Sequence, residues 1–449
     1  MSIVRRAVPV LLSSLVAVPL LAQTSAPAPE DGRLAALVEE ALARNPSVQE
    51  ADEAVAAARA RPDQARALPD PTVSLTYTND GWSPTLGERD MTTLSVMGSQ
   101  VLTWPGKRRL RGAVSGLEAD EVAHQAERVR LNLVASVKRA YLGLLLAREL
   151  QAVIHEQEGI WKEMEGVARA RYGVGQGAQQ DVLRVQVEVT RIQQLRAEQQ
   201  AETSIRRAEL NRLLARSADA PIETTDHLDL VKGSRSREDT LAQVEQESPE
   251  LRAAASAVER DRLLVGLADK EGRPDFAVQA GYMNRGRLDP MWQAGVTFNL
   301  PLRRRRLQGA RAEAVARARA SERRLESLRL ELRFRTEERL AQLETAETLA
   351  RLYGDGIVPQ DQMSVEAAVA NYQAGKVPFV AVLEALSTQY DDRSTHLRVL
   401  ASHQRIRASL EEASLDATSD LATGGGARGR AASPLGGAPA PGAMTAMGK

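Results

Sequence analysis

The sequence predicts a mostly α-helical protein with a membrane β-barrel contribution. Its repeating unit is a β-hairpin followed by long antiparallel helices, and it occurs twice. The stretch 91–104 alternates apolar and polar residues and runs through Pro105 and a basic cluster into a long helical pattern. The stretch 291–300 does the same through Pro301. Seven of the fifteen aromatic residues lie in the windows 72–104 and 275–300, as in a lipid-facing band.

The composition excludes several classes of function. With 59 basic and 59 acidic residues the formal net charge is zero, which gives no support for nucleic-acid binding. The sequence has no cysteine, so disulfides, thiolate zinc sites, cysteine nucleophiles and N-terminal lipidation of the bacterial type are ruled out. An apolar content of 43% is enough to bury a core.

The N-terminus has the pattern of a secretory signal peptide, which we assign to residues 1–22. Arg5 and Arg6 form a basic region, and the apolar run 7–22 precedes a polar, proline-rich segment. A membrane anchor is the alternative, but Pro9 and Pro19 interrupt a run that is short for a span of ~20 apolar residues. We therefore expect an exported protein without a membrane helix.

The first structural repeat is predicted to cover residues 23–232. A helix over 32–43 ends before Asn45-Pro46, and a second helix runs from 47 to about 67. Strands follow at about 72–78 and 91–104, and we interpret them as a β-hairpin of membrane-spanning length, since ~9–11 tilted residues cross a bilayer. A long helical hairpin over 107–214 turns at the glycine-rich segment 172–177.

The second structural repeat is predicted to cover residues 233–415 with the same plan. Helices over 238–247 and 250–271 precede strands at about 275–283 and 291–300, joined by a loop over 284–290. The helical hairpin 302–413 is expected to break at 354–359 and to turn at Tyr372–Gly375. Tyr172 and Gly175 recur as Tyr372 and Gly375 at the same offset. Residues 416–449, rich in glycine, alanine and proline, are predicted to be disordered.

Four strands cannot close a barrel, and an open sheet edge is not tolerated in lipid. Three identical chains would supply twelve strands, within the range of bacterial outer-membrane barrels. Pro105 and Pro301 then mark the corners where a strand becomes a helix. The basic clusters after them are expected at the membrane–water boundary, with solvated helix starts as the alternative; these are Lys107, Arg108, Arg109, Arg111 and Arg303 to Arg306.

The chain resembles the outer-membrane efflux protein family, the TolC-like exit ducts, over roughly residues 32–413. The resemblance rests on an ordered set of short motifs: Asn45-Pro46, Leu68-Pro-Asp-Pro71, Trp104-Pro-Gly-Lys107, Tyr141-Leu-Gly-Leu-Leu-Leu-Ala147, Tyr172-Gly-Val-Gly175 and Tyr372-Gln-Ala-Gly375. It implies a homotrimeric duct in the outer membrane with a twelve-stranded β-barrel and a long periplasmic α-barrel. It also implies a periplasmic adaptor (membrane fusion) protein and a proton-driven inner-membrane pump as partners.

By this resemblance the protein passively conducts small toxic compounds or metal ions out of the cell. A type I protein-secretion duct is the alternative, because the pump chooses the cargo. A surface coiled-coil structural or adhesive protein is the rival from another class, but it would leave the two apolar hairpins unexplained.

The resemblance also implies a gate at the periplasmic tip, where carboxylates of three chains form rings. Asp181 and Glu384 occupy such places, although Ala381 stands where many family members have an aspartate. The alternative is that both are ordinary carboxylates of a helix's first turn. Tyr172 and Tyr372 are expected to bond to neighbouring helices or simply to pack, and Gly175 and Gly375 to form the turns.

No catalytic, cofactor or metal site is predicted, and the protein is not expected to be an enzyme. The five histidines do not occur at metal-ligand spacing. Met91 and Met97 fall in a predicted strand and are expected to face lipid rather than bind copper.

Overall fold

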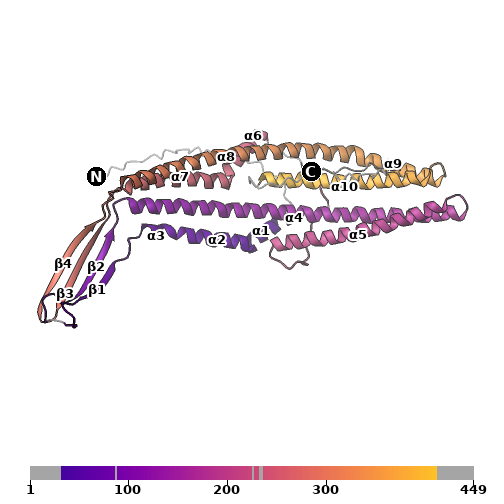
Figure 1. Ribbon diagram of the computed structural model, residues 1–449. Coiled ribbons are helices and arrows are strands. Elements are labelled where there is room, and N and C mark those ends of the chain that lie inside the picture. Colours follow the sequence, from indigo (N-terminus) through magenta and orange to yellow (C-terminus); the bar gives the residue numbers. More distant parts are fainter. Residues whose placement is uncertain (1–31, 86–87, 225–226, 232–235, 412–449) are drawn as a thin grey trace, which may run out of the picture.

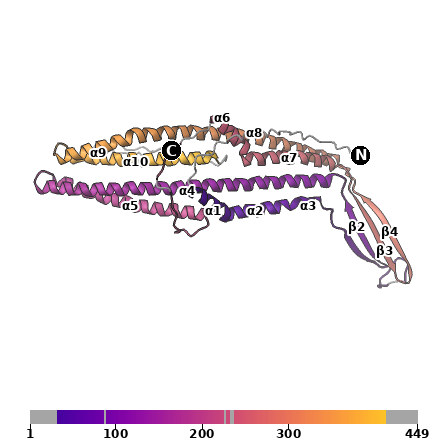
Figure 2. The same ribbon diagram turned by 180° about the vertical axis from the view of Figure 1, so that it is seen from behind.

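The computed structural model describes residues 32–85, 88–224, 227–231 and 236–411. The chain forms a long rod of parallel-lying helices with a sheet bent away from one end of it (Figures 1 and 2). The predicted signal peptide (1–22) and the predicted disordered tail (416–449) lie outside the described residues.

The sheet has four antiparallel strands in the order β1-β2-β3-β4. Their bounds are Thr72–Thr78, Thr93–Leu102, Phe276–Arg285 and Leu288–Phe298. The central pair, β2 and β3, joins the two halves of the chain. The strands therefore lie where the alternation predicts them, and both outer strands, β1 and β4, have one unpaired edge among the described residues.

The predicted loop over 284–290 is wrong. β3 and β4 form a tight hairpin in which Arg285 pairs with Leu288, so that only two residues make the turn. Gly286 adopts a φ of 67°, which is strained for other residues, and its N–H donates to Asn284 Oδ1 at 2.8 Å. A turn glycine thus extends the pairing through residues that look loop-like in sequence.

The two faces of the sheet differ in character. Leu75, Val96, Tyr282 and Trp292 lie side by side across the four strands on one face. The alternate residues on the other face are mostly serine, threonine, glutamine and glycine. Along β2 and β3 the apolar face is the more exposed one, as expected for the convex side of a curved sheet. The polar face is therefore the concave one.

In the first half of the chain, the other helices pack along one long helix, α4. α4 has 67 residues, which corresponds to about 100 Å at ~1.5 Å per residue. It spans Lys107–Gly173. Beside it lie four shorter helices: α1, Gly32–Arg44; α2, Pro46–Arg59; α3, Arg61–Arg66; and α5, Gln179–Leu213. The helix expected over 47–67 is interrupted at Ala60, because Pro62 cannot take an interior helical position there.

The second half repeats this order. Its elements are α6, Arg237–Glu247; α7, Pro249–Lys270; α8, Arg304–Leu352; a π-helical turn, Tyr353–Ile357; α9, Val358–Gln373; and α10, Phe379–Glu411. The break predicted at 354–359 is wrong. The helix continues through these residues as a π-helical turn, a wider form that accommodates Pro359 and the two glycines without interrupting the helical path.

The core lies along α4, which contacts helices of both halves. Near its middle, Tyr141 and Leu144 pack with residues of α1 and α5, and Asn45 ties the same region together. Its Nδ2 donates to Leu213 O at 2.8 Å, and its Oδ1 caps α2 by accepting from Ser47 N at 2.9 Å. This buried asparagine explains what the Asn45-Pro46 motif does in the fold.

Candidate functional site: the helical tip

The end of the rod away from the sheet is formed by two turns, one from each half of the chain (Figures 1 and 2). α4 turns into α5 at 174–178, and α9 turns into α10 at 374–378. Gly175 and Gly375 both have φ of 75°. In both turns the residue after this glycine donates its N–H to a carbonyl five residues earlier, Gln176 to Arg171 at 2.9 Å and Lys376 to Asn371 at 2.8 Å. Both are therefore Schellman C-caps, in which glycine avoids the strain of positive φ.

The two turns are joined through Tyr372. Its hydroxyl lies 3.4 Å from Asp181 Oδ2 on α5, and the Arg171 guanidinium of α4 lies over its ring at 4.6 Å from the centroid. Arg171 Nη1 also donates to the backbone carbonyl of Tyr372, and Nη2 donates to Gln176 O at 3.0 Å. Tyr372 is 2% exposed and packs edge-on against Phe379. We call Arg171, Tyr372 and Asp181 the tip latch.

The latch carries opposite charges on either side of a buried phenol. Burial raises the pKa of Tyr372, the Asp181 carboxylate raises it further, and Arg171 opposes the shift. The phenol therefore stays protonated and remains a hydrogen-bond donor toward Asp181 across the physiological range.

Equivalent tip residues in the two halves differ in burial and in their contacts. Tyr172 is 50% exposed, whereas Tyr372 is buried. Glu384, on the exposed side of α10, forms no hydrogen bond or ion pair within the described ranges. The structure thus brings together Asp181 and Tyr372 among the predicted residues, and leaves Tyr172 and Glu384 apart from them.

Arg171 is the residue of the latch that sequence reasoning missed. The sequence points to Arg171 in one way only, through a difference between the two halves: Arg171 precedes Tyr172, whereas Asn371 precedes Tyr372. A guanidinium at that position is long enough to cross from one turn to the other, and an asparagine is not.

The opposite end of the rod holds the two strand-to-helix corners. Lys107, 1% exposed, pairs with Asp275 at 3.1 Å and donates to Arg273 O at 2.9 Å. Asp275 also accepts the N–H of Trp104 at 2.7 Å. Burial would raise the pKa of Asp275, but the Trp104 N–H and Lys107 outweigh it and hold the pKa below its usual value. The corner at Pro105 is therefore locked to the start of β3.

The basic residues near the corners differ in exposure and in pairing. Lys107 is buried and paired, so it is not part of an exposed cluster. Arg111 lies 3.5 Å from Glu271, and both side chains are about 40% exposed. Arg303 to Arg306, just after Pro301, are exposed at the start of α8, and within the described residues none of them forms an ion pair.

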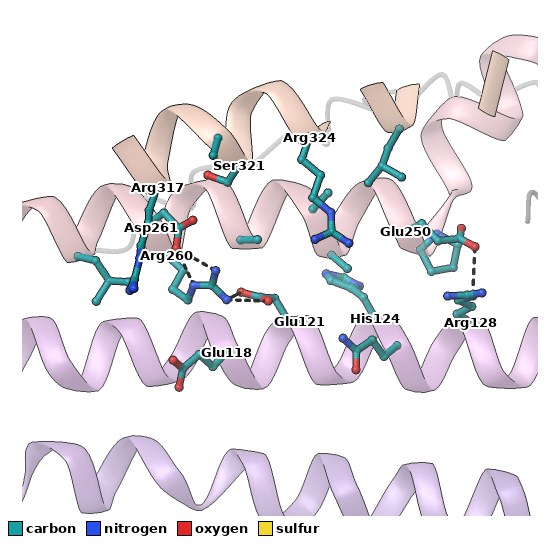
Figure 3. A pocket seen from close by; sticks show the side chains of 18 residues that line it. Glu118, Glu121, His124, Arg128, Glu250, Arg260, Asp261, Arg317, Ser321 and Arg324 are labelled. Carbon is teal, nitrogen blue, oxygen red and sulfur yellow. Dashed lines mark hydrogen bonds and ion pairs between the residues drawn. The ribbon is translucent and has the colours of Figure 1, made fainter. Parts of the chain in front are cut away.

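A groove of about 870 Å³ lies between α4, α7 and α8. Figure 3 shows Arg260 reaching from α7 to Glu121 on α4 at 2.7 Å, and Arg128 beside Glu250 at 3.3 Å. Burial raises the pKa of Glu121, and Arg260 opposes it. The charges of the groove are largely satisfied by one another, and this arrangement serves helix packing rather than catalysis.

The described residues contain neither a metal-binding cluster of acidic and histidine side chains nor a membrane-spanning helix. No group of three or more histidine, aspartate or glutamate residues among them is placed to hold a metal ion. In the same residues, no helix is both long enough and apolar enough to cross a membrane.

Comparison with known proteins decides the family. The profile of the outer membrane efflux proteins matches residues 37–216 and 240–414. The chain belongs to this family. Its members are outer-membrane channels with a periplasmic portion, and they are not enzymes. The two matched segments correspond to the two halves described above.

Individual outer membrane efflux proteins are similar to this chain in sequence or fold. The cobalt-zinc-cadmium resistance protein CzcC of Cupriavidus metallidurans is 23% identical over 284 residues, 63% of this chain and 68% of that protein. The outer-membrane channel OprN has a TM-score of 0.71 at 20% identity, covering 85% of this chain and 90% of that one. VceC of Vibrio cholerae has a TM-score of 0.73 at 18% identity, covering 85% and 96%. The predicted fold class is thereby confirmed.

Proposed function

We propose that this efflux protein is the outer-membrane exit duct of a tripartite efflux system. The observation that carries the proposal is the four-stranded sheet, which is apolar on its convex face and unpaired at both edges. Such a sheet cannot sit alone in lipid, because its free backbone groups would remain unsatisfied. Pairing β4 of one chain with β1 of the next closes a barrel in a homotrimer.

The helices support the same assembly. α5 and α8 expose apolar side chains along the rod: Leu183, Val187 and Ile205 on α5, and Leu330 and Phe334 on α8, each at least half exposed. Exposed apolar side chains along a helix are typical of a protein–protein contact. In the trimer, α8 of one chain packs beside α5 and α2 of the next, so that the helices close into a tube below the barrel.

The corners then lie at the membrane surface. The exposed group Arg303 to Arg306 follows the outward-facing Phe298 and Leu300, which are about 60% exposed. Arginines directly after lipid-facing residues fit the membrane–water boundary, where guanidinium groups meet phosphates and water. We assign the corners at Pro105 and Pro301 to the periplasmic face of the outer membrane.

The tip latch is the proposed gate. In a trimer, three copies of Asp181 and of Glu384 surround one axis, and like charges around a pore favour cations and oppose tight closure. The bonds of Tyr372 to Asp181 and of Arg171 to Tyr372 hold the two turns of one chain together. Opening requires these bonds to loosen, and docking of the periplasmic adaptor protein would supply the energy.

The proposed cargo is metal ions or small toxic compounds that a proton-driven inner-membrane pump delivers. The likeness to a cobalt-zinc-cadmium resistance protein supports the metal-ion branch. A deletion strain challenged with cobalt, zinc and cadmium salts and with dyes tests it. We expect the deletion strain to be sensitive and the intact gene to restore its tolerance, and unchanged tolerance to every compound after deletion would overturn the assignment of cargo.

Location and assembly are tested by fractionation. We expect a heat-modifiable trimer in the outer-membrane fraction, and a soluble monomer would overturn the duct. The gate is tested in planar bilayers with Asp181→Ala and Glu384→Ala, for which we expect altered conductance or weaker cation selectivity. Traces identical to those of the unaltered protein would remove both residues from the gate.

A further inference from the structure

The polar face of the sheet carries three methionines on adjacent strands. Met97 lies on β2, Met283 on β3 and Met291 on β4. The expectation that Met97 faces lipid is not met, because it lies on the face opposite Val96 and its apolar neighbours Leu75, Tyr282 and Trp292. Its position among serine, glutamine and glycine requires another explanation.

The register places the three side chains in one patch. Met283 pairs directly with Met291, and such pairs have Cβ atoms roughly 4.5–5.5 Å apart. Met97 pairs with Gly281 and is therefore diagonal to Met283, a spacing of about 7–8 Å that long side chains bridge. Gln293 joins the patch, with Nε2 3.8 Å from Met97 Sδ. We call Met97, Met283 and Met291 the methionine patch.

Packing does not account for the patch. Methionine in a core fills gaps between apolar neighbours. Here the residues paired with Met97 and Met283 on β1 and β2 are Ser74 and Ser95, and Met291 is 49% exposed. Gly281 lies between the methionines, and an added Cβ there would meet Val96 O at 3.1 Å and Met97 Cβ at 3.4 Å. The side chains of the patch are thus held close to one another on an accessible surface.

We propose that the methionine patch binds a soft monovalent cation, Ag(I) or Cu(I), through its thioether sulfurs. Thioethers are soft, uncharged ligands that select Cu(I)-type ions over magnesium, calcium or manganese. Neutral ligands on an open surface hold such an ion in rapid exchange, which suits a site from which the ion must leave again. The inference rests on the proposed function in one respect only, that the concave face lines the pore.

The test follows the methionine methyl groups by NMR. The full-length protein, purified in detergent with ¹³C-methyl methionine, is titrated with silver nitrate in chloride-free buffer. We expect the methyl signals of Met97, Met283 and Met291 to shift together and to saturate first. The 61%-exposed Met363 on α9 and the buried Met164 on α4 serve as internal references. Single Met→Leu variants, which conserve volume, assign the signals.

Two further variants make the result specific. The triple variant Met97→Leu, Met283→Leu, Met291→Leu should lose the early response, and Met363→Leu should keep it. Simultaneous shifts of the patch and of Met363 would overturn the proposal, since they indicate general thioether binding. An unresponsive patch would overturn it as well.

Pore formation is measured separately, so that the two hypotheses fail independently. The unaltered protein is tested for conductance of potassium nitrate in planar bilayers, a readout that does not depend on silver binding. A silver response in a protein that forms no pore would support the site and overturn the proposed function. Pore formation by a protein whose patch does not respond to silver would support the proposed function and overturn the site.

Discussion

Lys107 and Asp275 form an ion pair across 168 positions of sequence, with Nζ and Oδ1 3.1 Å apart. Lys107 is the first residue of α4 and Asp275 precedes β3, so the pair joins the strand-to-helix corner of the first half to the hairpin of the second. The lysine side chain is almost fully buried, and three oxygen contacts satisfy its ammonium group. Charge buried in this way is costly to leave unpaired.

Removing one partner of this pair should destabilise the corner strongly. Asp275→Asn leaves the ammonium of Lys107 without its counter-charge, and we expect a loss of roughly 3–5 kcal/mol in the free energy of unfolding. The double variant Lys107→Met, Asp275→Leu should lose less than Asp275→Asn alone. Urea unfolding of the detergent-solubilised protein measures both.

The exposed pair Arg111–Glu271 is the matched control, and Arg111→Met should change stability by less than about 1 kcal/mol. A similar loss in Arg111→Met and Asp275→Asn would contradict the special role of the buried pair.

The turn glycines should resist substitution because of their backbone conformation alone. Gly175 has open space around its α-carbon, so an added methyl meets no atom within 4 Å. Gly175→Ala should nevertheless destabilise the turn by about 1–2 kcal/mol, since φ is 75°. Hydrogen exchange at the Gln176 amide should accelerate accordingly. Gly173→Ala, at the end of α4 with equal space but ordinary φ, should not accelerate it.

Most of the fold follows from local patterns, and the exceptions have physical causes. Alternation over 72–78 and a proline-free helical pattern after Lys107 are enough to place β1 and α4. The turn at Gly286 and the π-helical turn at Tyr353–Ile357 are missed because glycine and proline in a sequence predict the end of a strand or helix, even where the strand or helix continues. At Gly286 the hairpin pairing of Arg285 with Leu288 continues the strands, and at the second place the helix continues through the π-helical turn.

The tip latch shows why the candidate site was only partly predictable. Asp181 is indicated by the resemblance to the efflux protein family, and Tyr372 is indicated because it repeats Tyr172 in the second half. Their contact at 3.4 Å depends on how α5 lies against α9, which no local pattern specifies. Arg171 is recognised only once the two turns are seen side by side.

The latch predicts an asymmetric response of the two equivalent tyrosines. Tyr372→Phe removes the hydroxyl beside Asp181 and should favour the open tip by about 1 kcal/mol, or roughly fivefold in the ratio of open to closed states. Tyr172→Phe, at an exposed position, should leave that ratio unchanged. Single-channel recording measures both. Equal effects of the two substitutions would show that the hydroxyl contact does not hold the tip.

Asp392 on α10 should make stability depend on pH. Burial raises its pKa, and the neighbouring carboxylate of Asp361 on α9 raises it further. A carboxyl group whose pKa is raised in the folded state stabilises the fold below its ordinary pKa of 3.8, and this stabilisation is lost as the pH rises through the folded value.

Asp392→Asn should therefore stabilise the protein at pH 7 and make less difference below pH 3.8. Thermal unfolding of both proteins across this range measures the effect. Asp391→Asn, an exposed neighbour, is the control and should show no such trend. A variant that gains stability only in acid would reverse the expected sign.

Neighbouring residues of β4 should separate the lipid face from the pore face. Val296 pairs with Val278 on the convex apolar face, and Thr297 pairs with Ala277 on the concave one. Val296→Arg puts a charge against lipid, which costs about 2–4 kcal/mol near the bilayer midplane, and should abolish the heat-modifiable trimer in the outer-membrane fraction. Thr297→Arg adds the same side chain one position along, should still assemble, and should shift ion selectivity toward anions. The opposite pattern, with Thr297→Arg failing to assemble and Val296→Arg tolerated, would mean that the faces are assigned the wrong way round.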